Sequence, residues 1–283
     1  MLAVIGGTGL YEMPELADRV EERVTTPFGM PSDSVVRAKL AGREMLFLSR
    51  HGRGHRCAAH QVNYRANLFA LKSRGATAVL SVSAVGSLRE TIAPGDLVVV
   101  DQYLDRTSGR VKSFFDGTGL VAHVGLAEPV DATLAAAITA AARTTGARVH
   151  PTGTYVCIDG PQFATKVESR LYGTWGGDVI GMTNQPEARL AREAELPYAS
   201  LCMVTDYDSW REGEGVELDM ILARLAAGTQ LARGTISALK LPDLSASPAA
   251  RALDAGLLTR ADAIDPEERA LLGPLLRRVL AAR

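Results

Sequence analysis

The segment that decides the fold reads ATAVLSVSAVG and spans residues 76–86. Its first eight residues are a run of apolar and small side chains, which is typical of a strand buried on both faces. Gly86 then stops the run. Comparable short runs recur along the chain, so we expect strands at 2–5, 44–48, 76–83, 96–100, 154–158, 178–181 and 198–204.

Helical patterns separate these runs. Apolar residues at helical spacing predict a helix that begins near Val62 and ends before Gly75, a residue that suits a helix C-terminus. We expect further helices over 131–146 and 186–195, and a long helix through Leu218, Ile221, Leu222 and Leu225 after the last strand. Alternating strands and helices indicate an α/β fold with a single domain.

The C-terminal segment has a different pattern. Residues 242–248 read PDLSASP, which is typical of a loop. Asp265 and Pro266, followed by two glutamates, form a helix start signal ahead of one amphipathic helix with leucines at 271, 272, 275 and 276. We therefore predict a main domain over residues 1–241 and a helical extension over residues 242–283 that packs on the same domain.

Composition excludes several classes of protein. Of the 283 residues, 47% are hydrophobic and 22% charged, which argues against extensive disorder. The net charge of -1 disfavours broad nucleic-acid binding, and the apolar stretches are too short to cross a membrane. Cys57, Cys157 and Cys202 are widely spaced, which predicts reduced thiols rather than disulfides or a zinc site. No basic leader precedes Leu2, so we expect a cytoplasmic protein.

Small and charged residues follow four of the predicted strands. The ends read GGTG at 6–9, SRHG at 49–52, SAVGS at 83–87 and TDYD at 205–208. In α/β sheets, ligands bind beyond the carboxyl ends of the strands. We therefore expect these four ends to form one composite site.

Two of these ends suit an anion. Backbone N–H groups of residues 7–9 and the Thr8 hydroxyl are donors, although a plain tight turn is the alternative interpretation. Arg50 and His51 offer a planar cationic fork and a ring donor for an oxyanion, and a surface salt bridge is the alternative here. His55 and His60 follow, but no carboxylate joins them at the spacing of zinc motifs, so we expect no metal.

The fourth end suits a nitrogen heterocycle. Asp206 and Asp208 stand two residues apart, where two carboxylates repel and one can hold a proton. Such a pair can accept from an amino group and donate to a ring nitrogen, and a solvated acidic turn is the alternative. Phe163 and Trp210 are either core residues or stack on a planar ligand.

These residues belong to a longer series of motifs. Together the motifs resemble the 5′-methylthioadenosine phosphorylases, in the trimeric branch of the purine nucleoside phosphorylase family. They read IGGTGLY (5–11), TPFGMPSD (26–33), RHGRGH (50–55), HQVNYRANLFAL (60–71), SAVGSLRE (83–90), PGDLVVVDQYLDRTSGR (94–110), SFFDG (113–117), HVGLAEP (123–129), DGPQFATKVES (159–169), GMTNQPEARLARE (181–193) and TDYDSW (205–210). The C-terminal segment carries no such motif.

The resemblance implies a fold and a reaction. The fold is a mixed central β-sheet flanked by helices. The enzyme is a pentosyltransferase in which inorganic phosphate attacks the anomeric carbon of S-methyl-5′-thioadenosine, releasing adenine and 5-methylthioribose 1-phosphate, as in purine and methionine salvage. Phosphate is a co-substrate, and no cofactor or metal is expected. The resemblance also implies a homotrimer with active sites at the subunit interfaces.

Site residues follow from the same resemblance. The phosphate-binding positions are Thr8, Arg50, His51, Ser83, the Ala84 backbone and Thr183. The nucleoside positions are Phe163, Met182, Asp206, Asp208, Leu218, Leu222 and, from a neighbouring subunit, His123. Asp206 is assigned to protonation of purine N7 and Asp208 to acceptance from the 6-amino group, and these two roles can be exchanged.

Some positions differ from the best-known members and leave the substrate open. Gln162 replaces an arginine, Ala164 replaces a serine, and Val85 stands where some members have cysteine. These changes bear on the 5′ substituent, so another 5′-substituted adenosine is an alternative substrate. Three further functions stay open: a 6-oxopurine nucleoside phosphorylase acting on methylthioinosine or inosine, a nucleosidase that uses water, and a non-catalytic nucleoside-binding protein.

Overall fold

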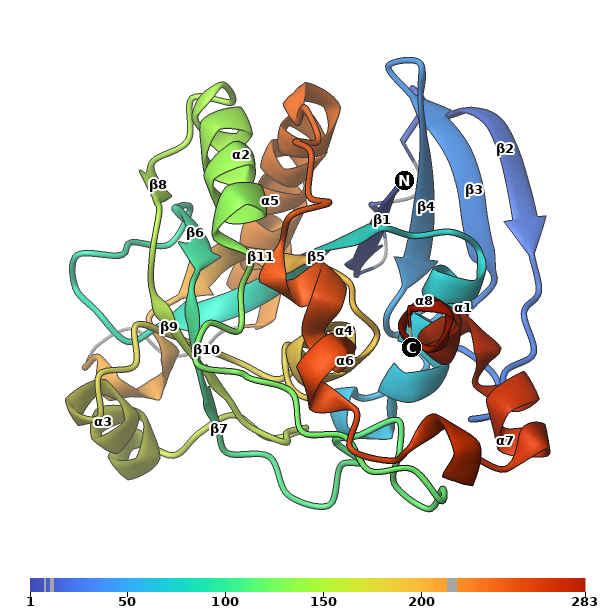
Figure 1. The fold of residues 1–283 in the computed structure, drawn as a ribbon. Coiled ribbons are helices and arrows are strands. Elements are labelled where there is room, and N and C mark those ends of the chain that lie inside the picture. The colour runs from blue at the N-terminus through green and yellow to red at the C-terminus, as the bar shows by residue number, and fades with distance from the viewer. Residues whose placement is uncertain (8, 11–12, 213–217, 283) are drawn as a thin grey trace.

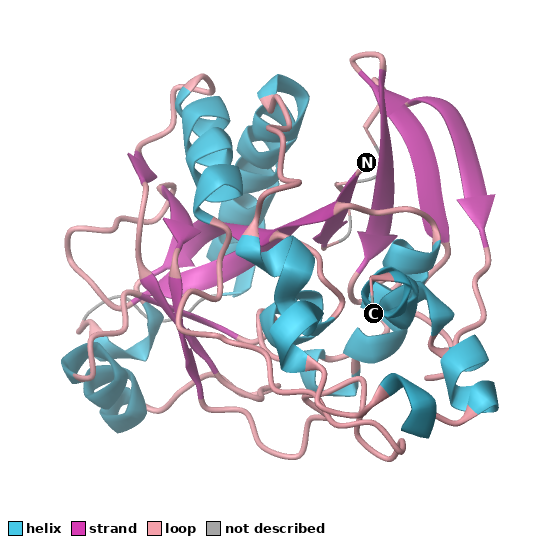
Figure 2. Cartoon of the chain, viewed as in Figure 1, coloured by secondary structure: helices cyan, strands magenta, loops and turns pink. Residues whose placement is uncertain are grey.

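A computed structural model of the chain describes residues 1–7, 9–10, 13–212 and 218–282. A mixed β-sheet forms its centre, and helices cover the sheet on both sides (Figures 1 and 2). The strands are β1 (Leu2–Gly6), β2 (Ala17–Glu22), β3 (Val35–Leu40), β4 (Arg43–Ser49), β5 (Ala78–Ser87), β6 (Leu97–Val100), β7 (Gln102–Asp105), β8 (Val149–His150), β9 (Thr154–Cys157), β10 (Val179–Gly181) and β11 (Tyr198–Asp206). The helices are α1 (Tyr64–Ser73), α2 (Ala132–Arg143), α3 (Lys166–Thr174), α4 (Glu187–Glu193), α5 (Leu218–Ala238), α6 (Ala252–Gly256), α7 (Pro266–Leu271) and α8 (Gly273–Ala281).

Strand β5, which contains most of the ATAVLSVSAVG segment, is the hub of the sheet. It pairs in parallel with β1 and with β11, and it pairs in the antiparallel sense with β10. On the far side of β1, β4 is also parallel. The carboxyl ends of β4, β1, β5 and β11 therefore meet at one edge of the sheet, and the expected mixed sheet is confirmed.

Strands β1, β4, β5 and β11 are buried on both faces, because their residues are divided between two apolar clusters. In β4, Leu46 and Leu48 join one cluster, while Met45 and Phe47 join the other. The first cluster contains residues of α1, α4, α6 and α8, and the second contains residues of α2 and α5. Figure 1 shows these two groups of helices on different sides of the sheet. A strand between these two groups of helices can therefore be apolar throughout.

Most predicted elements are present, and the differences have local causes. The seven predicted strands correspond to β1, β4, β5, β6, β9, β10 and β11, but β5 continues beyond its predicted end at residue 83 and through Gly86 to Ser87. Strands β3, β7, β8 and β2 were not predicted, and the residues of β2, ADRVEE, are nearly all exposed and show no apolar pattern. This strand exists because its backbone pairs with β3. Helix α3 was not predicted either, although Thr165 and Glu168 form a capping box at its start.

The prediction of one amphipathic helix after residue 265 is wrong, because the segment forms two helices, α7 and α8. Asp265 caps α7 as predicted, accepting from the Glu267 N–H at 2.8 Å. Pro274 has no N–H and suits only the first turn of a helix, so α7 ends and α8 begins around it.

The C-terminal helices pack against the main body of the chain. Leu253, Leu275, Leu276 and Val279 lie in the same apolar cluster as residues of β1 and β4. The predicted boundary between residues 241 and 242 remains a prediction. Within the described ranges, no helix is both long and apolar enough to cross a membrane.

Candidate active site

A cavity of about 690 Å³ opens where the carboxyl ends of the parallel strands meet. All four strand ends expected from the sequence contribute to its wall, so the composite site is present. The wall contains Gly7, Leu10, Arg50, His51, His55, Arg56, Ala58, Ala59, Gln61, Val82, Ser83, Ala84, Val85, Gly86, Ile158, Pro161, Phe163, Ile180, Gly181, Met182, Thr183, Met203, Thr205, Asp206, Asp208, Leu225 and Thr229. Thr8 lies outside the described residues.

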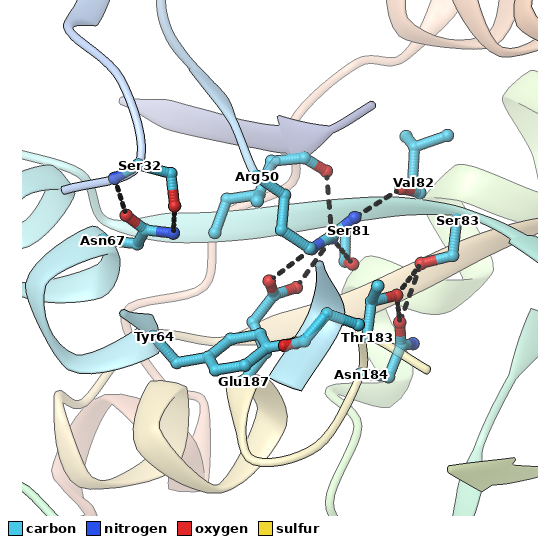
Figure 3. A network of polar contacts seen from close by, with 12 residues as sticks. Ser32, Arg50, Tyr64, Asn67, Ser81, Val82, Ser83, Thr183, Asn184 and Glu187 are labelled. Carbon is cyan, nitrogen blue, oxygen red and sulfur yellow. Dashed lines mark hydrogen bonds and ion pairs between the residues drawn. The ribbon is translucent and has the colours of Figure 1, made fainter. Parts of the chain in front are cut away.

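Arg50 follows the last residue of β4 and is one of the largest fully buried side chains. Its Nε and Nη2 donate to the two carboxylate oxygens of Glu187 at 2.8 and 3.0 Å. Nη1 donates to the Val82 carbonyl and Nη2 to the Ser81 hydroxyl, at 3.0 and 2.7 Å (Figure 3). Arg50 is therefore a buried, fixed cation, and the interpretation as a surface salt bridge is excluded.

His51 follows Arg50 in the chain, and a backbone carbonyl of the turn that follows it holds its ring in place. Its Nδ1 lies 2.8 Å from the Cys57 carbonyl oxygen, and its ring stacks on that of His55 with centroids 4.3 Å apart. Burial and the neighbouring Arg50 charge lower the pKa of His51 to about 4. The ring is therefore neutral near pH 7 and does not supply the positive charge of an anion site.

Hydroxyl groups from two elements meet next to Arg50 (Figure 3). The Ser83 and Thr183 hydroxyl oxygens lie 3.0 Å apart, and Ser83 also donates to the Asn184 side-chain oxygen at 2.8 Å. Because Ser83 donates its single hydroxyl proton to Asn184, Thr183 is the donor in the 3.0 Å contact with Ser83, and its hydroxyl must turn away from Ser83 to donate to a ligand. Ala84 follows Ser83 on β5 and also borders the cavity.

Asp206 and Asp208 do not form a solvated turn, so that interpretation is excluded. Asp206 ends β11, and its two oxygens accept from the Asp208 N–H and the Thr205 hydroxyl, both at 2.7 Å. Asp208 is only 4% exposed, and its Oδ2 has no hydrogen-bond partner among the described residues. Burial, together with the charge of Asp206, raises the pKa of Asp208.

Gly86 makes room for this pair of carboxylates. A Cβ atom at this position would lie 2.9 Å from Asp206 Oδ1 and 3.1 Å from the Asp208 Cβ. The glycine that stops the apolar run of β5 is thus required by the packing of the acidic pair. From the sequence alone, Gly86 is expected to end the strand, whereas β5 continues through it to Ser87.

Of the residues considered for contact with the nucleoside, some border the cavity and others do not. Phe163 and Met182 both border the cavity, and Phe163 is 57% exposed, so it is not a core residue. Trp210 does not border the cavity, and its ring N–H donates to the Ser87 carbonyl at 2.7 Å. Phe163 is therefore the aromatic residue available for stacking.

The residues expected for the 5′ pocket are not gathered in this single chain. The Leu218 side chain lies outside the described part of the structure. Leu222 is 51% exposed and His123 is exposed, and neither borders the cavity of its own chain. On α5 the cavity wall contains Leu225 and Thr229 instead.

Two buried charged residues support the cavity and were not predicted. One is Glu187, the partner of Arg50. The other is Arg110, whose guanidinium donates to the carbonyl oxygens of Met182 and Asp159 at 2.8 and 2.9 Å and so ties together two segments of the wall. Both lie within motifs of the sequence, but their partners are far away along the chain, and no local pattern indicates them. No cluster of metal-ligating side chains occurs in the part of the chain that the structure describes.

Comparisons with known proteins agree with the geometry. Residues 1–239 match a family model described as "Phosphorylase superfamily". The S-methyl-5′-thioadenosine phosphorylase of Cereibacter sphaeroides is 51% identical, over 99% of this chain and 98% of the relative. A solved methylthioadenosine phosphorylase from an Antarctic soil metagenomic library has a TM-score of 0.92 and 41% identity, covering 97% of this chain and 98% of its own. Methylthioadenosine phosphorylase from Schistosoma mansoni, in complex with tubercidin, has a TM-score of 0.81 and 33% identity, covering 91% of this chain and 99% of its own.

Proposed function

This chain belongs to the phosphorylase superfamily, and from that premise we infer that it catalyses the phosphorolysis of S-methyl-5′-thioadenosine to adenine and 5-methylthioribose 1-phosphate. It is a pentosyltransferase of the purine nucleoside phosphorylase type. The observation that carries this function is that one cavity contains both the Arg50 cation, beside the hydroxyl groups of Ser83 and Thr183, and the carboxyl groups of Asp206 and Asp208. The first suits an oxyanion, and the second suits an aminopurine.

Phosphate is proposed to bind at the Arg50 end of the cavity. Arg50, His51, Ser83, the Ala84 backbone and Thr183 would surround it, together with Thr8. Because Glu187 holds the guanidinium of Arg50 in one orientation, the cation is positioned before the anion arrives. Holding phosphate against the anomeric carbon lowers the barrier mainly by positioning the two reactants.

Adenine is proposed to bind between Phe163 and the acidic pair. The unpartnered Oδ2 of Asp208 is an acceptor without a donor, and the 6-amino group of adenine would supply one. Burial is the largest cause of the raised pKa of Asp208, although contacts with Ser169 and Ser209 act in the opposite direction. A hydrogen bond from the amino group of adenine would favour the charged carboxylate and so oppose this rise. Asp206 would then face N7 and donate a proton to it as negative charge gathers on the departing purine.

The reaction balances with these groups alone. The bond between the anomeric carbon and N9 breaks with its electron pair on the purine, and a phosphate oxygen forms the new bond to that carbon. Adenine leaves with one proton more than the departing base, which Asp206 delivers at N7. Hydrogen phosphate loses one proton as it becomes the sugar phosphate dianion, so Asp206 is restored without net release of protons.

The sugar and its 5′ group are proposed to be enclosed by two subunits of a homotrimer. Within one chain, Met182 and Phe163 border the cavity, while Leu222 and His123 are exposed and lie outside it. These exposures support a site that a neighbour completes with His123. Mixing an Asp206→Asn variant with a His123→Ala variant should then restore activity, because some sites in mixed trimers carry both native residues. Absence of restoration, with subunit exchange verified, would contradict the shared site.

We also propose that the protein acts in the cytoplasm, and that its reaction belongs to purine and methionine salvage. The three cysteines are free thiols, which is typical of a reducing compartment.

The function is tested by a substrate panel at fixed phosphate. The panel compares 5′-methylthioadenosine, adenosine and 5′-methylthioinosine, and release of the free base is followed spectrophotometrically. We expect turnover to depend on phosphate and 5′-methylthioadenosine to be the best substrate. Turnover that is unchanged without phosphate would instead indicate a nucleosidase, and preference for the inosine analogue would indicate a 6-oxopurine enzyme.

A further inference from the structure

The tautomer of His51 is fixed by its hydrogen bonds. Its Nδ1 lies 2.8 Å from the Cys57 carbonyl oxygen, which can only accept, so Nδ1 carries the ring proton. The Cys57 N–H in turn donates to the His51 carbonyl at 3.0 Å, which closes a small loop of backbone around the ring. The orientation of the ring is therefore set by the backbone and does not depend on a bound ligand.

The other ring nitrogen is consequently a hydrogen-bond acceptor. His51 is only 9% exposed, with Arg50 beside it and the His55 ring stacked on it, and all three features disfavour a positive charge on the ring. In a neutral ring with the proton on Nδ1, Nε2 holds a lone pair. No described residue donates a hydrogen bond to this nitrogen, and the His51 side chain borders the cavity.

An acceptor is unusual in a site for an anion. Among the other groups proposed around phosphate, the Ala84 N–H and Arg50 can only donate. A lone pair repels a bare anionic oxygen, but it accepts from an oxygen that carries a proton. Moreover, Glu187 balances the charge of Arg50, so the surroundings do not demand a fully deprotonated anion.

We propose that His51 accepts a hydrogen bond from the one hydroxyl group of hydrogen phosphate and so selects this anion against dianions that carry no proton, such as sulfate. This inference rests on the phosphate site proposed above. Hydrogen phosphate and sulfate are both tetrahedral dianions at pH 8, so charge and shape do not distinguish them. The remaining proton on hydrogen phosphate does distinguish them, and His51 is the group that accepts a hydrogen bond from it. Fixing the protonated oxygen at His51 also leaves a bare oxygen to face the anomeric carbon.

The proposal is tested by competition between anions during turnover at pH 8. The Michaelis constant for phosphate is compared with the inhibition constant of sulfate, and arsenate, which is protonated like phosphate, serves as a third anion. We expect sulfate to bind about ten- to a hundredfold more weakly than phosphate, because an acceptor left facing a bare oxygen is costly. Arsenate should behave like phosphate.

Substitution then assigns the effect to one residue. His51→Ala removes the acceptor and puts neither a donor nor an acceptor in its place, so the preference for phosphate should fall to within about threefold of sulfate. His60→Ala makes the same change at an exposed histidine outside the cavity, and it should leave the ratio unchanged. A preference that survives His51→Ala in a folded variant would overturn the proposal.

A spectroscopic measurement keeps the test independent of folding in the variant. In ¹⁵N spectra of the wild type, His51 should show a protonated Nδ1 and an unprotonated Nε2, and phosphate but not sulfate should shift Nε2. An Nε2 proton, or equal inhibition by sulfate and phosphate, would overturn the inference and leave the phosphate site intact. An Nε2 that responds to nucleoside but to neither anion would overturn it as well, and would assign the lone pair to a sugar hydroxyl. Turnover without any dependence on phosphate would instead overturn the proposed function.

Discussion

Arg50 and Glu187 form a two-pronged ion pair in the wall of the cavity, with N–O distances of 2.8 and 3.0 Å. Their side chains are 1% and 2% exposed. Tyr198 adds a hydrogen bond to the same Glu187 carboxylate, at 3.0 Å. The cation of the proposed phosphate site is therefore part of the core, and stability and anion binding are coupled at this point.

Arg50→Lys should lower both stability and phosphate affinity. Lysine keeps the charge but cannot make the two-pronged contact, and breaking a buried pair costs about 3–5 kcal/mol when one partner is lost entirely. We expect a lower melting temperature and a higher Michaelis constant for phosphate. Arg53→Lys, at an exposed arginine outside the cavity, is the matched control. Unchanged phosphate saturation in Arg50→Lys would place the anion site elsewhere.

Asp208→Asn should narrow the preference for adenine over hypoxanthine. A carboxylate accepts from the 6-amino group but repels a 6-oxo group, and a buried mismatch of this kind can cost factors of about 10⁴. Asparagine can donate a hydrogen bond instead. We therefore expect kcat/KM for 5′-methylthioadenosine to fall, and the ratio of kcat/KM for 5′-methylthioinosine to that for 5′-methylthioadenosine to rise. The measurement is kcat/KM for both substrates.

Asp206→Asn should depress kcat for both bases, because the departing purine loses its proton source. General acid catalysis typically contributes about 10²–10⁴-fold, which sets the expected size of the loss. If Asp206→Asn retains kcat while Asp208→Asn abolishes it, the two roles are reversed. If neither variant changes either substrate, base recognition lies outside this pair.

Gly86→Ala should displace the carboxyl groups of Asp206 and Asp208, because the added methyl group would crowd them. The added Cβ would lie 2.9 Å from Asp206 Oδ1, a distance that requires one of the two to move. We expect a fall in kcat/KM for the nucleoside larger than any change in the Michaelis constant for phosphate. Gly273→Ala is the control, because a Cβ there meets no atom within 4 Å. A fully active Gly86→Ala variant would contradict the placement of the pair.

Glu193 should make stability depend on pH. It accepts from the Phe114 N–H at 2.7 Å, and burial raises its pKa to about 7. The unfolded chain ionises near the ordinary glutamate pKa of about 4.3, so the stability that Glu193 contributes is complete below that pH and is lost as the pH rises toward 7. The loss should total about 2–4 kcal/mol.

Glu193→Gln removes this titration, so its unfolding free energy relative to the wild type should rise between pH 5 and pH 8. Urea denaturation at the two pH values measures it. Glu15→Gln, at an exposed glutamate, should show no such change. A pH-independent difference for Glu193→Gln would mean that the carboxyl titrates normally.

The enzyme should prefer a 5′-methylthio group to a 5′-hydroxyl group by a moderate factor. An apolar pocket distinguishes a methylthio group from a hydroxyl by about 1–3 kcal/mol, so 5′-methylthioadenosine should exceed adenosine in kcat/KM by roughly ten- to two-hundredfold. Equal efficiency would indicate a general adenosine phosphorylase.

The sequence by itself determined the buried strands around the site, the four strand ends and their convergence on one site. Apolar runs and their stops are local patterns, and β1, β4 and β11 follow them closely, whereas β5 continues through Gly86 to Ser87. It could not indicate β2, because that strand has no apolar pattern and depends on pairing with β3. The amphipathic pattern after residue 265 also continues across Gly273 and Pro274, where the chain forms two helices instead of one.

Only the tertiary structure decided how the site residues are charged and held. Arg50 and Glu187 lie 137 positions apart, so no local pattern joins them. The neutral state of His51 depends on burial, and the unpartnered oxygen of Asp208 depends on which donors the fold leaves out of reach. Desolvation and hydrogen-bond partnership are properties of a three-dimensional neighbourhood. A sequence can therefore name the groups at a strand end, whereas their protonation and orientation follow from what the fold packs around them.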